Sequence, residues 1–438
     1  MRIMVKIKKI GKILGFVILA LFVMGVIGYG AAYYISYKEL KKEFQKIRDS
    51  GEPLTLDELY SSPIPDEENA ALIYQKAFAL MDVNKEEIQR ITGIPLNKKA
   101  ENWPAEDKEA TTRLILKNNE IFTLLEEAAQ KPKCRFPLNP EKGLPIESLS
   151  HMRRCAQLLN IKASLEAKDG DINGAIKTCI TGLMIGESLS QESLLISQMF
   201  MISIDTIMAR AIEDILTKIE VNNADYDDLY MALKRVREKG SVNLKGELCF
   251  TTDYALRHKK SEVLCVDKRK AKNIIWLLYY TKLGRPWFKM NQIYYLRTMA
   301  KAISISNKPY RQATNILDEY RKSIPKYCTS IRMLTESIKE HFQHEACHDA
   351  LIGAGEIAIE LRLYKSRHGK YPDTLKELAL NTTHELPFDP FTEQSYIYRK
   401  EKEGFIVYSV GANFKDDGGK YERHGGLYEL DIVWRCEI

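Results

Sequence analysis

Apolar residues recur every three to four positions through most of residues 38–339, and glycines fall mainly where this spacing is interrupted. Positions three and four apart share one face of a helix, so this period is typical of amphipathic helices. Runs rich in β-branched residues are scarce in the same stretch. The pattern predicts a helical domain over residues 38–339.

The clearest unit of this domain is a helical hairpin with a third helix laid on it. Helical spacing covers residues 146–168 and resumes over residues 172–189, with Gly170 and Asp171 as stop and cap between them. A third apolar segment follows over residues 194–219. Asp205 interrupts it, and the run before Asp205 is shorter than the ~20 residues of a membrane span. We therefore expect a buried core helix there.

The pattern changes near residue 340. A long helix is predicted by apolar residues at helical spacing, which are Cys347, Leu351, Ala354, Ala358 and Leu361. Gly369 marks its end, and a short helix capped by Asp373 or Thr374 follows. Aromatic and β-branched runs at residues 396–398, 405–408 and 430–434 predict strands. The chain is thus expected to be mainly α, with a small α+β module over residues 340–438 in which the helix packs on a short antiparallel sheet.

An anchor is predicted at the N-terminus, over residues 1–37. Residues 13–37 carry no charged side chain. As a helix, this uncharged run is long enough to cross a hydrocarbon core of ~30 Å. The preceding residues are basic without an acidic neighbour: Arg2, Lys6, Lys8, Lys9 and Lys12. The positive-inside rule places this end in the cytoplasm, with a single pass through the bacterial inner (cytoplasmic) membrane and a periplasmic bulk. A cleaved signal peptide is the alternative, because residues 28–32 are mostly small.

Four motifs follow one another in the C-terminal module: a stretch ending in Tyr-Pro at residues 364–372, FDPF at 388–391, YSVG at 408–411 and DI at 431–432. In this order they resemble the globular domain of type II secretion major pseudopilins. The whole chain also looks like an uncharacterised bacterial membrane-anchored family that carries such a module. The resemblance implies a structural or docking unit linked to a secretion or envelope assembly.

The anchor departs from the pseudopilin pattern at one position. The family is processed at a glycine followed by phenylalanine, with a glutamate at the fifth mature position. Gly15 and Phe16 match, whereas Ala20 stands in place of the glutamate. Since that carboxylate matches the new amino terminus of a neighbour in the family's fibres, we do not expect assembly into a pilus-like fibre.

Net charge, cysteine content and the absence of several motifs bear on the partners and chemistry of the protein. The net charge of +6 arises from 65 Lys and Arg against 59 Asp and Glu, an excess too diffuse to imply nucleic acid. Eight cysteines in an oxidising compartment allow roughly 105 full pairings. Cys249 and Cys265 bracket a polar segment that a disulfide would restrict, and buried free thiols are the alternative for the others. No motif for serine, phosphate or dinucleotide chemistry is present, so no small-molecule substrate is evident.

One motif suggests zinc chemistry. His344, Glu345 and His348 match H-E-x-x-H on a predicted helix, where the two histidines would bind zinc and the glutamate would act as base toward a metal-bound water. His341 shares their face. A zinc hydrolase needs a third ligand from a separate element, and the acidic candidates are Glu377 and Glu385.

The pseudopilin resemblance implies a calcium site in the loop after YSVG. Family members bind calcium there through acidic side chains and backbone carbonyls. Asn413 stands where the first aspartate is usual, while Asp416, Asp417 and Asp431 remain. Asparagine is a neutral oxygen ligand, so the affinity is expected to fall without vanishing. The alternative is a solvated acidic turn stabilised by glycines.

These features predict a membrane-anchored, extracytoplasmic, non-catalytic scaffold or binding protein with a protein partner. The competing hypothesis is a membrane-anchored zinc metallopeptidase, with Glu345 as base and His344 and His348 as ligands.

Overall fold

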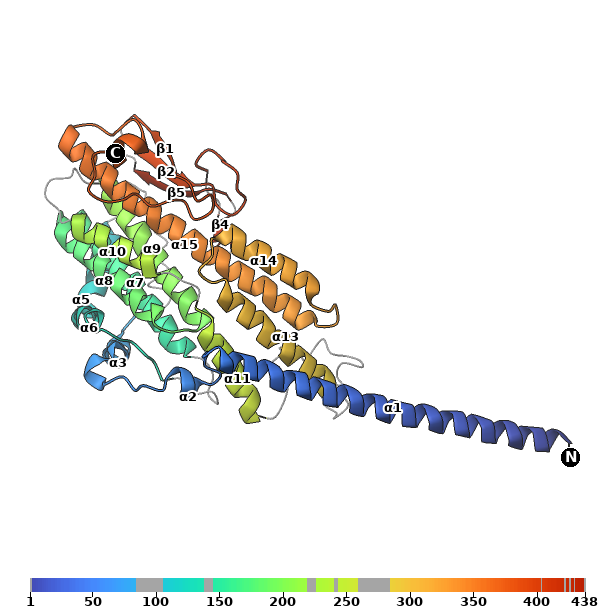
Figure 1. The fold of residues 1–438 in the computed structure, drawn as a ribbon. Helices are drawn as coiled ribbons and strands as arrows, with labels where there is room; N and C mark the ends of the chain where they lie inside the picture. The colour runs from blue at the N-terminus through green and yellow to red at the C-terminus, as the bar shows by residue number, and fades with distance from the viewer. Residues whose placement is uncertain are drawn as a thin grey trace. The chain divides into compact units, whose positions relative to one another are not determined.

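The computed structural model describes residues 2–83, 105–137, 145–218, 226–239, 243–258, 284–402, 404–420, 423–424, 427–428 and 430–436. Within them the fold is mainly α with a small antiparallel sheet near the C-terminus, as predicted (Figure 1). The chain divides into two compact units. Unit 1 comprises Met1–Leu59, Leu248–Ala302 and Glu319–Glu336, and unit 2 comprises Tyr60–Glu247, Ile303–Asp318 and Ser337–Ile438.

The predicted domain boundary between residues 339 and 340 lies inside a single helix, α15 (Thr329–His368). The change in side-chain pattern near this point marks the part of the helix that becomes fully buried. Helical backbone hydrogen bonds continue through it, so the sequence pattern and the compact units group the chain differently.

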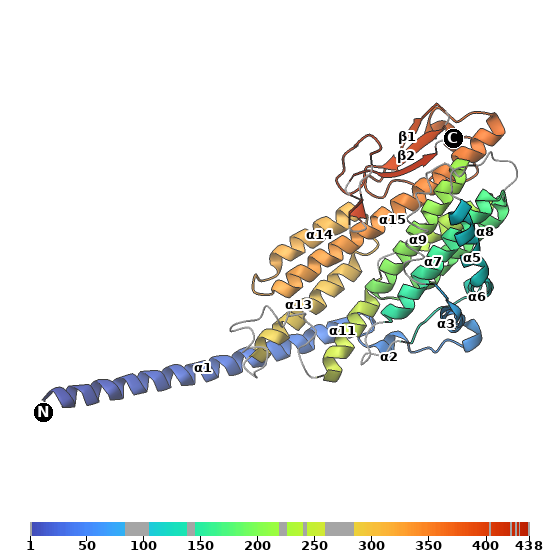
Figure 2. The same ribbon diagram turned by 180° about the vertical axis from the view of Figure 1, so that it is seen from behind.

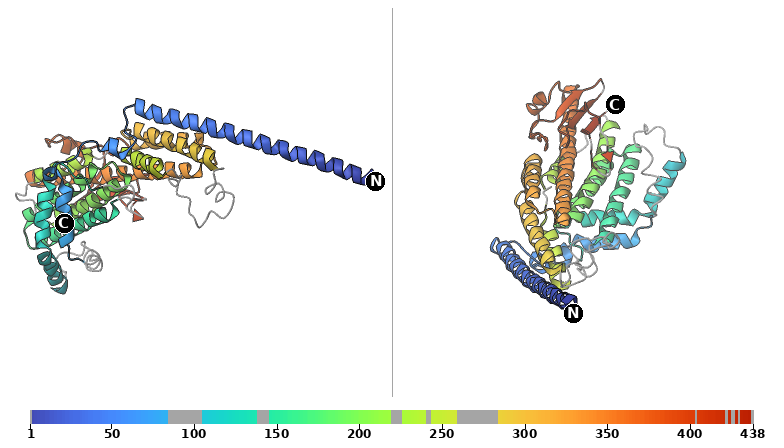
Figure 3. Two further views of the ribbon diagram at one scale, coloured as in Figure 1. Left: turned by 90° about the horizontal axis from the view of Figure 1, so that it is seen from below. Right: turned by 90° about the vertical axis from the view of Figure 1, so that its right-hand side faces the viewer.

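Unit 1 contains α1 (Arg2–Asp49), α2 (Leu56–Leu59), most of α11 (Lys245–His258) and α13 (Arg285–Ser304), with the end of α14 (Tyr310–Ser323) and the start of α15. Among the described elements of unit 1, none lies beside the first half of α1 (Figure 3). Its apolar residues are exposed, with Phe16 at 74% and Ile27 at 65%. An exposed apolar helix of this length is consistent with a membrane anchor or a signal sequence.

The second half of α1 packs into unit 1. Leu40 and Ile47, seven residues apart, are buried on one face of the helix. Glu43 lies between them and accepts hydrogen bonds from Nε and Nη2 of Arg297 on α13, at 3.0 and 2.8 Å. This paired geometry fixes the register of α1 against α13.

Unit 2 is built around the predicted hairpin and third helix, which are α7 (Ile146–Lys168), α8 (Ile172–Ser190) and α9 (Leu195–Lys218). Gly170 ends α7 with a φ of +87°, a conformation that favours glycine. The Asp171 carboxylate caps α8 by accepting a hydrogen bond from the Gly174 amide at 2.9 Å. The stop and cap are therefore confirmed.

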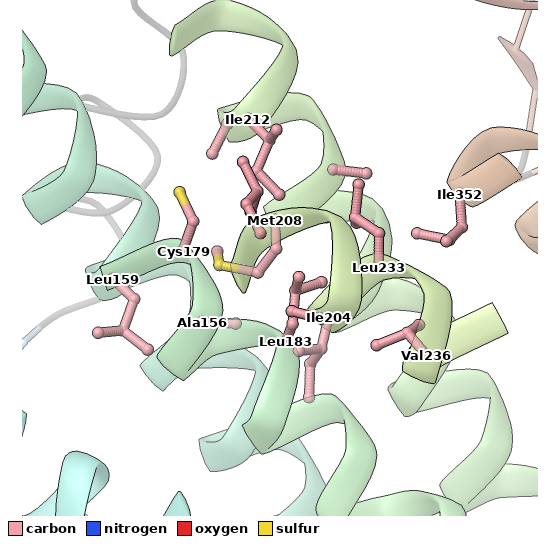
Figure 4. Close-up of a cluster of buried hydrophobic side chains, with 14 of the residues drawn as sticks. Ala156, Leu159, Cys179, Leu183, Ile204, Met208, Ile212, Leu233, Val236 and Ile352 are labelled. Atoms are coloured by element: carbon pink, nitrogen blue, oxygen red, sulfur yellow. The ribbon is translucent and has the colours of Figure 1, made fainter. Parts of the chain in front are cut away.

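Four further helices of unit 2 are α3 (Ala70–Leu80), α5 (Ala105–Lys117), α6 (Asn119–Ala129) and α10 (Tyr226–Lys239). The core between α7, α8 and α9 is apolar (Figure 4). A Cβ on Gly182 would lie 2.1 Å from Met208 Sδ, so α8 and α9 approach closely. Ile204, Met208 and Ile212 are buried, as predicted for a core helix.

The C-terminal module packs a three-stranded sheet against α15 (Figure 2). The strands β1 (Ile397–Lys400), β2 (Phe405–Ser409) and β5 (Ile432–Cys436) are antiparallel in the order β1-β2-β5. The short hairpin β3 (Arg423–His424) and β4 (Leu427–Tyr428) is separate from this sheet. Helix α16 (Leu375–Ala379) is capped by Thr374, which accepts a hydrogen bond from the Glu377 amide at 3.1 Å. Helix, cap and strands match the prediction.

Contact between α15 and the sheet depends on a helical glycine. A Cβ on Gly355 would lie 2.7 Å from Trp434 Cζ3 and 3.2 Å from Leu233 Cδ1. Trp434 is fully buried, so its rigid ring has no free space into which to move.

We predict that Gly355→Ala lowers the thermal midpoint of the full-length protein in detergent. Alanine favours a helix over glycine by about 1 kcal/mol, but overpacking a rigid core costs typically about 1–3 kcal/mol. The control is Gly28→Ala in α1, where a Cβ meets nothing within 4 Å. A midpoint for Gly355→Ala at or above that of the control would contradict the close packing.

Candidate functional site

The residues of the H-E-x-x-H motif lie on α15, in unit 2. His344 is half-buried, Glu345 is 7% exposed and His348 is 2% exposed. His344 and His348 are one helical turn apart, as the motif requires. The buried pair faces α9, where Asp205 lies.

His348 forms a buried pair with Asp205. The distance from His348 Nε2 to Asp205 Oδ2 is 3.0 Å, and both side chains are almost completely enclosed. Burial alone would lower the pKa of His348, but the Asp205 hydrogen bond and nearby Asp349 raise it to about 10. A Cβ on Gly186 of α8 would lie 2.0 Å from Asp205 Oδ1, so this glycine makes room for the carboxylate.

Glu345 lies beside this pair without a hydrogen bond of its own. Neither of its carboxylate oxygens has a partner among the described residues, and both are buried. Burial raises the pKa of Glu345 to about 7, the charges of Asp349 and Asp205 add to the rise, and His348 opposes it. A buried carboxylate without partners favours its neutral form.

His341 belongs to a different contact. Its Nε2 lies 2.9 Å from Oε1 of Gln198, whose side-chain amide donates to the Asn243 carbonyl oxygen at 2.5 Å. Burial is the main reason that the pKa of His341 falls to about 4, with the charge of His344 second. The structure therefore places His341 and His348 against two different partners on α9.

Two of the side chains proposed to bind zinc, those of His348 and Glu377, contact other residues in the structure. Nε2 of His348 is directed at Asp205, and Glu377 accepts a hydrogen bond from the Tyr364 hydroxyl at 2.6 Å. Glu385 is exposed. Within the described part of the chain, no three His, Cys, Asp or Glu side chains are grouped so as to hold a metal ion. The zinc site remains a prediction.

The acidic loop does bring its predicted residues together. Nδ2 of Asn413 donates to Asp417 at 2.8 Å, and Asp431 accepts from the amides of Gly419 and Asp417 at 2.7 and 3.3 Å. Asp416 accepts from the Tyr408 hydroxyl at 2.9 Å. These carboxylates accept hydrogen bonds from the loop and from Tyr408 of β2. The calcium site remains a prediction.

The described cysteines are all buried: Cys134, Cys155, Cys179, Cys249, Cys328, Cys347 and Cys436. The Cys249 thiol donates to the Pro53 carbonyl oxygen at 3.3 Å. Cys265 lies outside the described residues, so its pairing with Cys249 is untested.

A surface groove of about 500 Å³ lies between α8 and α10. Ile176, Ile180 and Met184 contribute to its lining from α8 at positions four residues apart, and Met231 contributes from α10. The charged lining residues are Lys177, Asp228 and Arg235. Both this groove and the role of Asp205 were missed from the sequence. A lone aspartate within an apolar run was the only signal for Asp205, and no local pattern shows that α10 lies beside α8.

Comparison with known proteins gives no match: no family model matches the chain, and no curated protein or solved structure matches it.

We predict that Glu345→Gln alters the pH dependence of stability. Because the folded pKa of Glu345 is raised from 4.5 to about 7, its stabilising contribution is complete below pH 4.5 and is lost as the pH rises through 7. Glutamine stays neutral, so the variant should gain up to about 3 kcal/mol relative to wild type between these values. The measurement is thermal unfolding at pH 5 and pH 8. Glu340→Gln, an exposed position on the same helix, is the control, and parallel curves for wild type and Glu345→Gln would contradict the raised pKa.

The calcium hypothesis predicts that millimolar calcium raises the thermal midpoint of the full chain relative to chelator, because a ligand of the folded state stabilises it by mass action. Asp416→Asn with Asp417→Asn should abolish this rise, while Asp431 still accepts hydrogen bonds from the amides of residues 417 and 419. Glu385→Gln, an exposed carboxylate in the same module, should keep it. An unmoved wild-type midpoint, or an equal rise in the double variant, removes calcium from the loop.

Proposed function

We propose that this protein is a single-pass, membrane-anchored, non-catalytic scaffold or binding protein. In this proposal α1 is the anchor, its basic leader stays in the cytoplasm, and the bulk of the chain lies outside the cytoplasmic membrane. The pseudopilin-like module acts as a structural cap or docking unit. The observation that carries the binding role is the groove between α8 and α10.

The lining of the groove suits an apolar protein segment. Ile176, Ile180 and Met184 form a row along α8, since residues four apart lie on one helix face. Met231 on the opposite helix is 51% exposed. Unbranched methionine side chains adapt to partners of irregular shape. Apolar grooves commonly bind the apolar face of an amphipathic helix.

The charges around the groove favour an acidic flank on that partner. Arg235 and Lys239 both contact the Glu187 carboxylate, so two cations share one anion. Lys177 adds a further positive charge and Asp228 a negative one. We propose that the groove binds an amphipathic helical segment of a partner protein with an apolar stripe and acidic neighbours.

The buried cluster supports a structural role for the H-E-x-x-H motif. Water and a peptide would have to reach Glu345 and His348, which are both enclosed in the helical core. A zinc hydrolase instead needs an open coordination position beside its glutamate.

We predict that Met231→Glu and Ile180→Glu each reduce recovery of the partner from native membranes at least tenfold, because either substitution buries a carboxylate in an apolar contact. Met333→Glu, at a position 66% exposed in unit 1, should retain it. Equal recovery for the groove variants and the control would reject the groove as the binding surface.

The zinc content of the purified full-length protein tests the non-catalytic part of the proposal. Stoichiometric zinc that is lost in His348→Ala, together with peptide hydrolysis by the wild type, would replace the scaffold with the metallopeptidase.

A further inference from the structure

The start of α13 lies beside the end of the apolar part of α1, within unit 1. Lys289 Nζ is 5.4 Å from the ring centroid of Tyr33 and 5.1 Å from that of Tyr37. These distances are typical of cation–π contacts, which are strongest where water is partly excluded. The lysine is thus held against two tyrosines of the anchor helix.

A second contact fixes this arrangement. Eight residues after Lys289, Arg297 binds Glu43 at 2.8 Å and approaches Glu39 at 3.5 Å. Eight residues of helix advance about 12 Å, a distance close to that from Tyr33–Tyr37 to Glu43 along α1. The two helices therefore run in the same direction, and the start of α13 is held at the level of Tyr33 and Tyr37.

This level corresponds to the membrane surface when α1 spans a bilayer. A hydrocarbon core takes about 20 helical residues, which from the last basic residue, Lys12, extends to about Ala32. Tyr33, Tyr34 and Tyr37 then lie in the headgroup layer, where tyrosine and tryptophan are enriched. Tyr34 is 65% exposed and Tyr37 is 52% exposed.

The start of α13 carries cations and an aromatic ring at the same level. Arg285 is exposed, while Trp287 and Lys289 are half-buried. We call these three residues the α13 tip. The Trp287 ring makes a T-shaped contact with the Phe288 ring, at a centroid distance of 4.9 Å. Burial lowers the pKa of Lys289, and the charge of Arg285 lowers it further. Two cations that repel each other attract an anion.

We propose that the α13 tip binds the headgroups of anionic phospholipids in the extracytoplasmic leaflet, where the apolar part of α1 ends. The inference rests on the proposed membrane anchor and adds a lipid specificity to it. Arg285 and Lys289 supply the charge that anionic lipids attract, and Trp287 supplies the amphipathic ring that lies at the interface.

The test uses the full-length protein in lipid nanodiscs of phosphatidylcholine alone or with phosphatidylglycerol, each lipid in turn carrying brominated chains. Bromine quenches tryptophan fluorescence at short range. We expect stronger quenching by brominated phosphatidylglycerol than by brominated phosphatidylcholine, and we expect Trp287→Phe to remove the difference.

The test variant and its control each remove two positive charges from unit 1. Arg285→Gln with Lys289→Gln should weaken the apparent affinity for phosphatidylglycerol about thirtyfold, at about fivefold per cation near an anionic surface. Lys322→Gln with Lys326→Gln, at two exposed positions, should leave it unchanged. Thermal midpoints in phosphatidylcholine discs check that each variant folds. Trp287→Phe tests the position of the α13 tip at the lipid surface without removing a charge.

The outcomes separate the two proposals. Protein that inserts into the discs but shows equal quenching by both lipids, or a preference that survives the Arg285 and Lys289 substitutions, overturns the lipid site alone. Protein that does not insert overturns the anchor and the lipid site with it.

Discussion

The constraint on which unit 2 depends is the complete burial of the middle of α15. Residues 350–362 are buried without interruption. At Gly355 the backbone lies close enough to Trp434 of β5 and Leu233 of α10 that any Cβ would contact both. A helix enclosed all round is stabilised by apolar residues, and its polar residues need hydrogen-bonding partners. One helix therefore joins the sheet to the helical core.

The three polar residues of this segment each have a hydrogen-bonding partner, while Nε of Arg362 has none among the described residues. Glu356 accepts two hydrogen bonds from Arg237 at 2.6 and 3.2 Å. Glu360 lies 2.6 Å from both the Thr382 hydroxyl and His384 Nδ1, and Arg362 donates to the Tyr371 hydroxyl at 3.1 Å. Removing one partner of such a pair leaves a buried charge that is costly. These contacts fix the register of α15 against α10 and the segments around residues 371–384.

Glu345 departs from this rule, because its buried carboxylate oxygens have no partner among the described residues. The adjacent Asp205 and His348 pair with each other through Oδ2 and Nε2, and Gly186 provides the space for the carboxylate. In unit 1 a comparable role falls to Arg297, which holds the partly buried Glu43 of the anchor helix. Within each unit, charged pairs therefore join helices that are distant in sequence.

The sequence by itself determined the elements, because these depend on short-range spacing and caps. The hairpin of α7 and α8, the cap at Asp171 and the three strands are local patterns, and all were predicted close to their observed positions. The motif of His344, Glu345 and His348 was also visible. Only the tertiary structure decided that His348 faces Asp205, that His341 faces Gln198, and that α8 and α10 form a groove. Such pairings join residues more than a hundred positions apart or depend on which helix faces lie side by side, and no local period encodes that choice.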